Sequence, residues 1–517
     1  MTSIESPRGF DRSRVTRLGL AGVVVLGVAM RLYHLDAQSL WYDEVITYLA
    51  AREPLSDYLW TNRYYATAHA LYFALVHLAL GFGSTELYLR LPSFVLGSVS
   101  IPLLYLVVRP WLGRGVALGA AALIAVSPFH VYYSQEARPY AALLCFGLVA
   151  LACLQRLRAG PRPWLWGAGA ALGIAAMLYT HPVALFFLPV LVLVPKKSSG
   201  SGRSCRWLVA AAAGLVLAAP ALVRIALHPP MRSTNPVEFV GLTATPYLFW
   251  TFVAGYSLGP SVRELHGPDR WGVALASAPV VLPVALLVGG LVLAGAALIR
   301  GDRRLLLVLG AWLLLPIAAV TVLAPLTRQP LNARYVILAF PALLILVAAG
   351  TVALPRRGLR VAAWVALLGV SGVALVNYYH ASRYQREDYR AAVAALRTEG
   401  RPGELVLVTA PYTILMFDYY DPGPLAVEPY PDRGSERGIA HRTTTRDWGF
   451  WVSELDRQIA GRSSFWVLLS RTWRHDPPGL LVPYLDDRFV RVWSGSWAGT
   501  RLIRYEIPQA ATASRAP

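Results

Sequence analysis

The stretch AHALYFALVHLALGFG, residues 68–83, decides the topology of this chain, because it can be counted as a membrane span or left out. Counting it would invert the side of every later loop. His69, Tyr72 and His77 recur along it at helical spacings, which is typical of an amphipathic helix lying in the membrane interface. We therefore leave it out of the spans and expect it to lie on the outer face.

The composition is that of a polytopic membrane protein. Of the 517 residues, 56% are hydrophobic and only 15% are charged, and the mean hydropathy is +0.47. A soluble protein of this length is not expected to be so apolar. About eleven apolar runs approach the ~20 residues that a helix needs to cross a bilayer; they are 18–33, 91–108, 115–132, 140–154, 164–180, 183–195, 207–226, 274–299, 305–324, 335–354 and 361–378.

The basic residues predict the orientation. A net charge of +19 would indicate a nucleic-acid partner only if the basic residues clustered on one soluble face, but they fall in short loops between apolar runs. With 68–83 left out, all the clusters face the cytoplasm, as the positive-inside rule requires. The N-terminus is then cytoplasmic and the tail is outside. The clusters are Arg8, Arg12, Arg14 and Arg17; Arg109 and Arg114; Arg156, Arg158 and Arg162; Lys196, Lys197, Arg203 and Arg206; Arg300, Arg303 and Arg304; and Arg356, Arg357 and Arg360.

The tail differs from the rest in composition. Its acidic residues and alternating apolar positions predict two helices, EDYRAAVAALRTEG and DWGFWVSELDRQIAG, and four strands, ELVLVTA, SFWVLLS, RFVRVWSG and TRLIRYEI. We therefore divide the chain into a transmembrane domain, residues 1–380, and a small extracytoplasmic α/β domain, residues 381–517.

The unusual polar residues gather on the predicted outer face. They lie in QSLWYDEVITY (38–48), SQEARPY (134–140), YTHP (179–182), a long loop over 227–272, and TRQPLNARY (327–335). Charges next to the hydrocarbon are costly unless they are paired or hydrated, so such residues are candidates for function.

Each candidate has a structural alternative. Asp43 and Glu44 suit an acid/base or metal-binding pair, or a hydrated loop pair. Glu136 and Arg138 suit a substrate site, or an ion pair at the start of a helix with Pro139 at its first position. Arg334 either extends to the interface as a snorkelling side chain or faces a lipid phosphate. His181 is interfacial or functional.

These motifs together resemble the GT-C glycosyltransferases. Within them the chain is most similar to the bacterial family 39 and 83 proteins, relatives of protein O-mannosyltransferases and of the lipid A aminoarabinose transferase. The resemblance covers about residues 15–350 and rests on the acidic pair of the first outer loop, the helix at 68–83, LRLPSFVLGSVSIPLLYLVVRPWLGR (89–114), SPFHVYYSQEARPYAAL (127–143) and ARYVILAFPALLILVAAG (333–350). It implies a mainly α, polytopic GT-C bundle.

The resemblance also implies a reaction. Members transfer a sugar, with inversion, from a polyprenyl-phosphate donor to an acceptor hydroxyl on the outer face of the cytoplasmic membrane. Carried over, Asp43 is the base and Glu44 orients substrate or tunes Asp43, whose pKa we expect the neighbouring carboxylate to raise. The predicted substrate-binding residues are Glu136, Arg138, Tyr140, His181, Arg334, Tyr335 and His69.

Three questions stay open at the level of sequence. Members of the family differ in whether they use a divalent cation, so a site with Mg²⁺ or Mn²⁺ and a site without metal are both compatible with the resemblance. The acceptor can be a glycan, a lipid or a protein. A transporter or flippase for a lipid-linked sugar is the alternative function, disfavoured because the spans carry few acidic residues and show no repeat.

Overall fold

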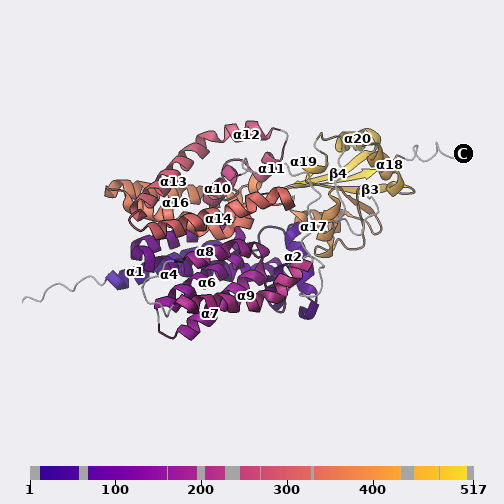
Figure 1. The fold of residues 1–517 in the computed structure, drawn as a ribbon. Coiled ribbons are helices and arrows are strands. Elements are labelled where there is room, and N and C mark those ends of the chain that lie inside the picture. Colours follow the sequence, from indigo (N-terminus) through magenta and orange to yellow (C-terminus); the bar gives the residue numbers. More distant parts are fainter. Residues whose placement is uncertain are drawn as a thin grey trace, which may run out of the picture.

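The computed structural model describes residues 12–57, 68–159, 161–194, 204–227, 245–267, 269–327, 331–431, 448–476 and 478–508. Figure 1 shows a long helical bundle at one end of the molecule and a smaller domain with a β-sheet at the other. The predicted combination of a transmembrane bundle and a small α/β domain is therefore confirmed.

Eight helices of the described residues are long and apolar enough to cross a membrane. They belong to α1 (Arg12–Leu32), α4 (Glu86–Val126), α6 (Tyr140–Ala159), α9 (Ser204–Leu227), α13 (Ala278–Ile299), α14 (Arg303–Thr327), η6 with α15 (Ala333–Ala339 and Phe340–Ala353) and α16 (Arg357–His380).

The eleven predicted apolar runs correspond to these eight helices with three differences. The runs 91–108 and 115–132 share the 41-residue α4, in which Gly113 adopts a left-handed φ of 76° and separates two helical halves. The run 164–180 forms α7 (Pro163–Thr180), which is not among the eight. The run 183–195 forms only the short η3 (Pro182–Phe187) and α8 (Leu188–Leu193).

The stretch 68–83 forms the short helix α3 (Ala70–Leu80), whose 11 residues span roughly 16 Å at 1.5 Å per residue. It is too short to cross a bilayer, as predicted. Its predicted amphipathic character is wrong, however, because the polar Tyr72 points into the protein and donates or accepts a 2.7 Å hydrogen bond with Ser93. The side chains it exposes are apolar, Leu78 among them.

Figure 1 shows the helices of the bundle running along its length, with α1 at the end away from the sheet domain. Of the basic residues, Arg109 lies near the break in α4, Arg162 directly precedes α7, Arg300 directly follows α13 and Arg356 directly precedes α16. Of the remaining basic residues, Arg8, Lys196, Lys197 and Arg203 lie outside the described residues.

The C-terminal domain holds one five-stranded sheet in the order β2-β1-β3-β5-β4. The first three strands are parallel, and β5 and β4 close the sheet as an antiparallel pair. The predicted elements are present, whereas β2, α19 and α20 were not anticipated. The elements are α17 (Tyr389–Glu399), β1 (Leu405–Val408), η8 (Pro411–Asp418), β2 (Ala426–Pro429), α18 (Trp448–Ile459), β3 (Ser464–Ser470), α19 (Thr472–His475), α20 (Leu481–Arg488), β4 (Val490–Trp497) and β5 (Thr500–Glu506).

Shorter helices connect or flank the long ones, and some of them lie next to the C-terminal domain. They are α2 (Tyr42–Arg52), η1 (Leu55–Asp57), α5 (Pro128–Ser134), α10 (Thr245–Ala254), α11 (Val262–Leu265), α12 (Arg270–Ala276) and η7 (Ser382–Tyr384). In Figure 1, α2 lies beside α17. Leu40, Val45 and Ile46 are buried in one apolar cluster with residues of α17 and of the sheet, including Tyr389 and Trp466. Burial of these side chains fixes α2 against the C-terminal domain.

Candidate functional site

The acidic pair lies in the first turn of α2. Asp43 and Glu44 follow Trp41, which has extended backbone angles and precedes the helix. Carboxylates in the first turn are favoured by the positive end of the helix dipole. Because successive residues of a helix are rotated by about 100°, the two side chains point in different directions and meet different partners.

Glu44 is fully buried and fully paired. Its carboxylate accepts hydrogen bonds of 2.9 and 3.0 Å from Arg90, 2.9 Å from Arg386 and 2.8 Å from the Ala137 backbone N–H. Burial alone would raise the pKa of Glu44, but Arg90 and Arg386 outweigh it and hold that pKa below its ordinary value. Through these hydrogen bonds Glu44 links α2 to α4, to the loop after α5 and to the segment after α16 that contains Arg386.

Asp43 keeps part of its surface open. Its side chain is 20% exposed, with Arg334 Nη1 at 3.0 Å from Oδ2 and Arg138 Nη2 at 3.7 Å. Arg138 also donates hydrogen bonds to the Asp43 carbonyl and to Thr47 Oγ1. An ionised carboxylate that remains accessible beside two cations can accept a proton or orient a polar ligand.

The expected rise in the pKa of Asp43 is wrong. Burial favours a rise, but the guanidinium groups of Arg138, Arg334 and Arg471 act more strongly in the other direction and lower the pKa. Glu44 contributes little to Asp43, since its own charge is already neutralised by Arg90 and Arg386.

A continuous chain of ring contacts extends from Arg334 through Tyr335 and Tyr140 to His181 and His69. The Arg334 guanidinium carbon lies 5.8 Å from the Tyr140 ring and 5.0 Å from the Tyr335 ring, and Nη2 donates to the Tyr335 hydroxyl at 3.1 Å. The His181 ring is 5.5 Å from Tyr140 and 4.8 Å from His69. The structure thus brings all nine predicted site residues together at the end of the bundle that meets the C-terminal domain.

The two histidines are neutral. His181 Nδ1 accepts from the Val183 backbone N–H, and His69 Nδ1 lies 3.1 Å from the Thr180 carbonyl, to which it must donate. The proton therefore sits on Nε2 of His181 and on Nδ1 of His69. Burial, followed by the charge of Arg138, lowers the pKa of His69 to about 3, and burial likewise lowers that of His181.

Two residues of the site were missed by sequence reasoning. Arg386, in the segment that follows α16, reaches Glu44 at 2.9 Å and Glu136 at 3.6 Å, and packs 4.7 Å from the Tyr132 ring. Arg471 follows β3, has a left-handed φ of 49°, and pairs with Glu387 at 3.1 Å. The charged string SRYQREDYR at residues 382–390 was the available signal for Arg386.

Several polar atoms of the site have no partner within the described residues. They are the Nε atoms of Arg138, Arg334 and Arg386, the Nη2 atom of Arg386 and Oε2 of Glu136, all of them buried. Buried polar groups in proteins are nearly always hydrogen-bonded, and each exception calls for an explanation. A concentration of such atoms around Arg138 and Arg334 is expected of a site that binds an anionic ligand.

A metal ion is poorly accommodated here. Within the described ranges, no three His, Cys, Asp or Glu side chains come together in a way that could hold one. Asp43 and Glu44 face guanidinium groups instead of each other. The described residues therefore do not fit Mg²⁺ or Mn²⁺ at the acidic pair.

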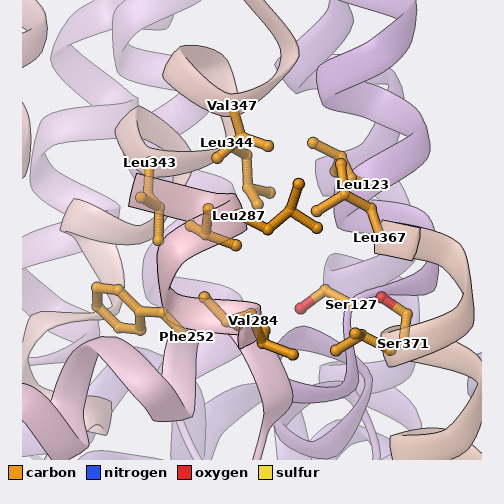
Figure 2. A pocket seen from close by; sticks show the side chains of 13 residues that line it. Leu123, Ser127, Phe252, Val284, Leu287, Leu343, Leu344, Val347, Leu367 and Ser371 are labelled. Carbon is orange, nitrogen blue, oxygen red and sulfur yellow. The ribbon is translucent and has the colours of Figure 1, made fainter. Parts of the chain in front are cut away.

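An apolar pocket lies in the bundle between α4, α10, α13, α15 and α16 (Figure 2). Its cavity volume is about 40 Å³. Apart from Ser127 and Ser371, its lining is aliphatic or aromatic, with Leu287 and Phe252 among the side chains that face it. The Phe252 ring is 5.4 Å from Phe340, in the chain segment that carries Arg334 at its start.

Residues 67–223 match the family model described as dolichyl-phosphate-mannose-protein mannosyltransferase. No curated protein sequence gives a match.

Solved structures are similar over nearly the whole chain. ArnT from Cupriavidus metallidurans in the apo state has a TM-score of 0.55 and 14% identity, covering 95% of this chain and 98% of that one. The same protein bound to undecaprenyl phosphate gives 0.53 and 15%, with the same coverage. The oligosaccharyltransferase AglB from Archaeoglobus fulgidus, in complex with an inhibitory peptide and a dolichol-phosphate, gives 0.52 and 12%, covering 97% of this chain and 75% of that one. The chain therefore has the GT-C fold, and the matched family and these neighbours are glycosyltransferases.

Proposed function

Because the chain has the GT-C fold, we propose that it transfers a sugar from a polyprenyl-phosphate donor to an acceptor hydroxyl, with inversion, at the outer face of the cytoplasmic membrane. The observation that carries this proposal is the convergence of the Asp43 carboxylate with Arg138 and Arg334. A base and two phosphate-binding cations are what a sugar transfer from a lipid phosphate needs.

The chemistry follows from these positions. Asp43 is ionised at neutral pH because its pKa is lowered, so it is ready to take the proton of an acceptor hydroxyl as the oxygen attacks the anomeric carbon. Arg138 and Arg334 face the departing phosphate and stabilise the charge that develops on it. A single displacement of this kind inverts the anomeric configuration.

Two further observations support a lipid donor. Two of the similar structures are described as bound to undecaprenyl phosphate and to a dolichol-phosphate. The apolar pocket in Figure 2 has the chemical character that an isoprenoid chain requires, since it is lined almost entirely by hydrocarbon. The nature of the sugar and of the acceptor, whether glycan, lipid or protein, is left to experiment.

The orientation is part of the proposal. With the basic loops at the far end of the bundle in the cytoplasm, Asp43 and the C-terminal domain lie outside. A nucleotide-linked sugar is then out of reach, and the donor must arrive on a lipid.

The test uses purified protein in lipid nanodiscs with a panel of radiolabelled polyprenyl-phosphate sugars. We expect one donor to be turned over, with inversion detected by NMR of the product. Asp43→Asn should slow transfer by about 10²–10⁴-fold while donor binding persists. The matched control is Asp36→Asn, which changes an exposed residue in the segment between α1 and α2. If no donor is bound or consumed while protein-containing vesicles move a lipid-linked sugar across the bilayer, the transporter alternative replaces this proposal.

A further inference from the structure

The Glu136 carboxyl group differs from that of Glu44, although both are buried in the same site. The Glu136 side chain is 2% exposed, and its Oε2 atom has no hydrogen-bond partner within the described residues. Its Oε1 atom lies 3.6 Å from Arg386 Nη2, which is beyond hydrogen-bond distance. Glu44, by contrast, accepts four hydrogen bonds. Burying an ionised carboxylate in this way costs much more free energy than burying a neutral carboxylic acid.

Charged and phenolic groups surround Glu136 from several elements. Arg386 belongs to the C-terminal segment, Glu44 to α2, Arg334 to η6, and Arg138 to the same loop as Glu136. The phenols that act on it are Tyr72 of α3, Tyr132 and Tyr133 of α5, and Tyr378 of α16. Arg386 is shared with Glu44, to which it makes the shorter contact, and its charge is the strongest influence that opposes the effect of burial on Glu136.

Burial raises the pKa of Glu136 to about 7, against the opposing effect of Arg386. The pKa of Asp43 is lowered instead. Asp43 is therefore ionised at neutral pH, whereas Glu136 is protonated in a large fraction of the molecules. Environments that separate two carboxyl groups in this way assign the base and the acid of a reaction.

We propose that Glu136 is the general acid of this site, and that its carboxyl group donates a proton to the leaving phosphate oxygen while Asp43 accepts the proton of the acceptor. The assignment rests on the transfer proposed above. It is supported by the unpartnered Oε2 atom and by the place of Glu136 in the same short loop as Arg138, whose backbone N–H donates to the Glu136 carbonyl at 2.7 Å.

The step balances in atoms and charge. The acceptor oxygen forms a bond to the anomeric carbon, and the bond from that carbon to the phosphate oxygen breaks with its electron pair going to the phosphate. The acceptor proton goes to Asp43, and the Glu136 proton goes to the phosphate, which leaves as a singly protonated polyprenyl phosphate. Return of the proton from Asp43 to Glu136 through water restores the resting site. A phosphate monoester has a second pKa near 6, close enough to that of Glu136 for proton transfer to be efficient.

The first arm of the test is the pH dependence of kcat in wild type, Glu136→Gln and Glu399→Gln, the last being an exposed residue of α17. Wild-type kcat should fall about tenfold per pH unit above the pKa of the acid. Glu136→Gln should lower kcat by about 10²–10⁴-fold and remove this alkaline limb, whereas Glu399→Gln should keep both. Retention of the limb in Glu136→Gln overturns the assignment.

The second arm does not depend on activity or on the folding of a variant. Infrared difference spectra of wild-type protein labelled with ¹³C-glutamate should contain a protonated-carboxyl band that disappears as the pH passes through neutrality. Absence of such a band in mildly acidic buffer overturns the assignment. A wild-type protein that turns over no donor at any pH overturns the transfer itself, which separates the two failures.

Discussion

Arg31 and the arginines around Asp43 lie at the same end of the bundle, and they differ in how many of their N–H groups have hydrogen-bond partners. Arg31, in α1, is fully buried and all five of its N–H groups have partners: Ser134 Oγ, the carbonyls of Gly27, Ala125 and Ile124, and His130 Nδ1. Arg138, Arg334 and Arg386 lie beside carboxylates, yet each keeps a buried Nε without a partner within the described residues.

The difference distinguishes a structural arginine from a ligand-binding one. Arg31 closes the carboxyl end of α4 by binding two of its terminal carbonyls, and no donor is left for a ligand. The arginines around Asp43 have donors to spare. Their incomplete pairing costs free energy, and in the proposed reaction the donor phosphate would relieve it.

The largest expected effect comes from Glu44, the one carboxylate of the site whose pairing is complete. Glu44→Gln removes the negative charge between Arg90 and Arg386, whose side chains are 2% and 8% exposed. Breaking such a buried pair costs about 3–5 kcal/mol. The measurement is the apparent free energy of unfolding in lipid, with Glu399→Gln as the control. A loss of activity with unchanged stability would show that Glu44 acts on substrate.

The same variant has a pH signature. Because the pKa of Glu44 is lowered in the folded protein, its stabilisation is present above the unfolded-state pKa of about 4.3 and is lost as the pH falls through the folded-state pKa. The wild type should therefore lose stability in acid, and Glu44→Gln should lose less. Parallel acid profiles for the two proteins would contradict the structural role of this carboxylate.

Arg334 should show the opposite division between stability and activity. Arg334→Gln removes one cation beside Asp43, together with a buried N–H group that has no partner within the described residues. We therefore expect transfer to fall by about 10²–10³-fold, with little change in the melting temperature. Arg300→Gln, which changes an exposed residue directly after α13, is the control. Equal activity in a less stable protein would place Arg334 with Arg31 as a structural residue.

Topology alone brings the predicted site residues together. Asp43 lies in the first turn of α2, Glu136 and Arg138 share the loop after α5, and Arg334 lies in η6. The alternation of spans assigns these three segments to one end of the bundle. The different environments of Asp43 and Glu44 could not be predicted. Neighbouring residues of α2 are rotated by about 100°, and the sequence does not say which partners lie in each direction.

Arg386 was missed for a different reason. It lies 342 residues from Glu44 in the chain, and the contact exists only because α2 is packed into the apolar cluster of the C-terminal domain. No local pattern encodes such docking. The break in α4 was visible to hydropathy by contrast, because the apolar runs 91–108 and 115–132 fall on either side of Gly113.

The smallest expected effect comes from Arg31, and it tests whether a fully hydrogen-bonded arginine contributes to stability alone. Arg31→Met leaves the carbonyls of Ala125 and Ile124 without their partner but also removes a buried charge that has no carboxylate beside it. These changes partly cancel, so we expect a loss of about 1–3 kcal/mol in stability, with Arg14→Met on the exposed start of α1 as the control. The folded fraction should retain wild-type kcat and donor affinity, because no N–H group of Arg31 is free to bind a ligand. A fall in donor affinity without a loss of stability would mean that complete pairing does not mark an arginine as structural.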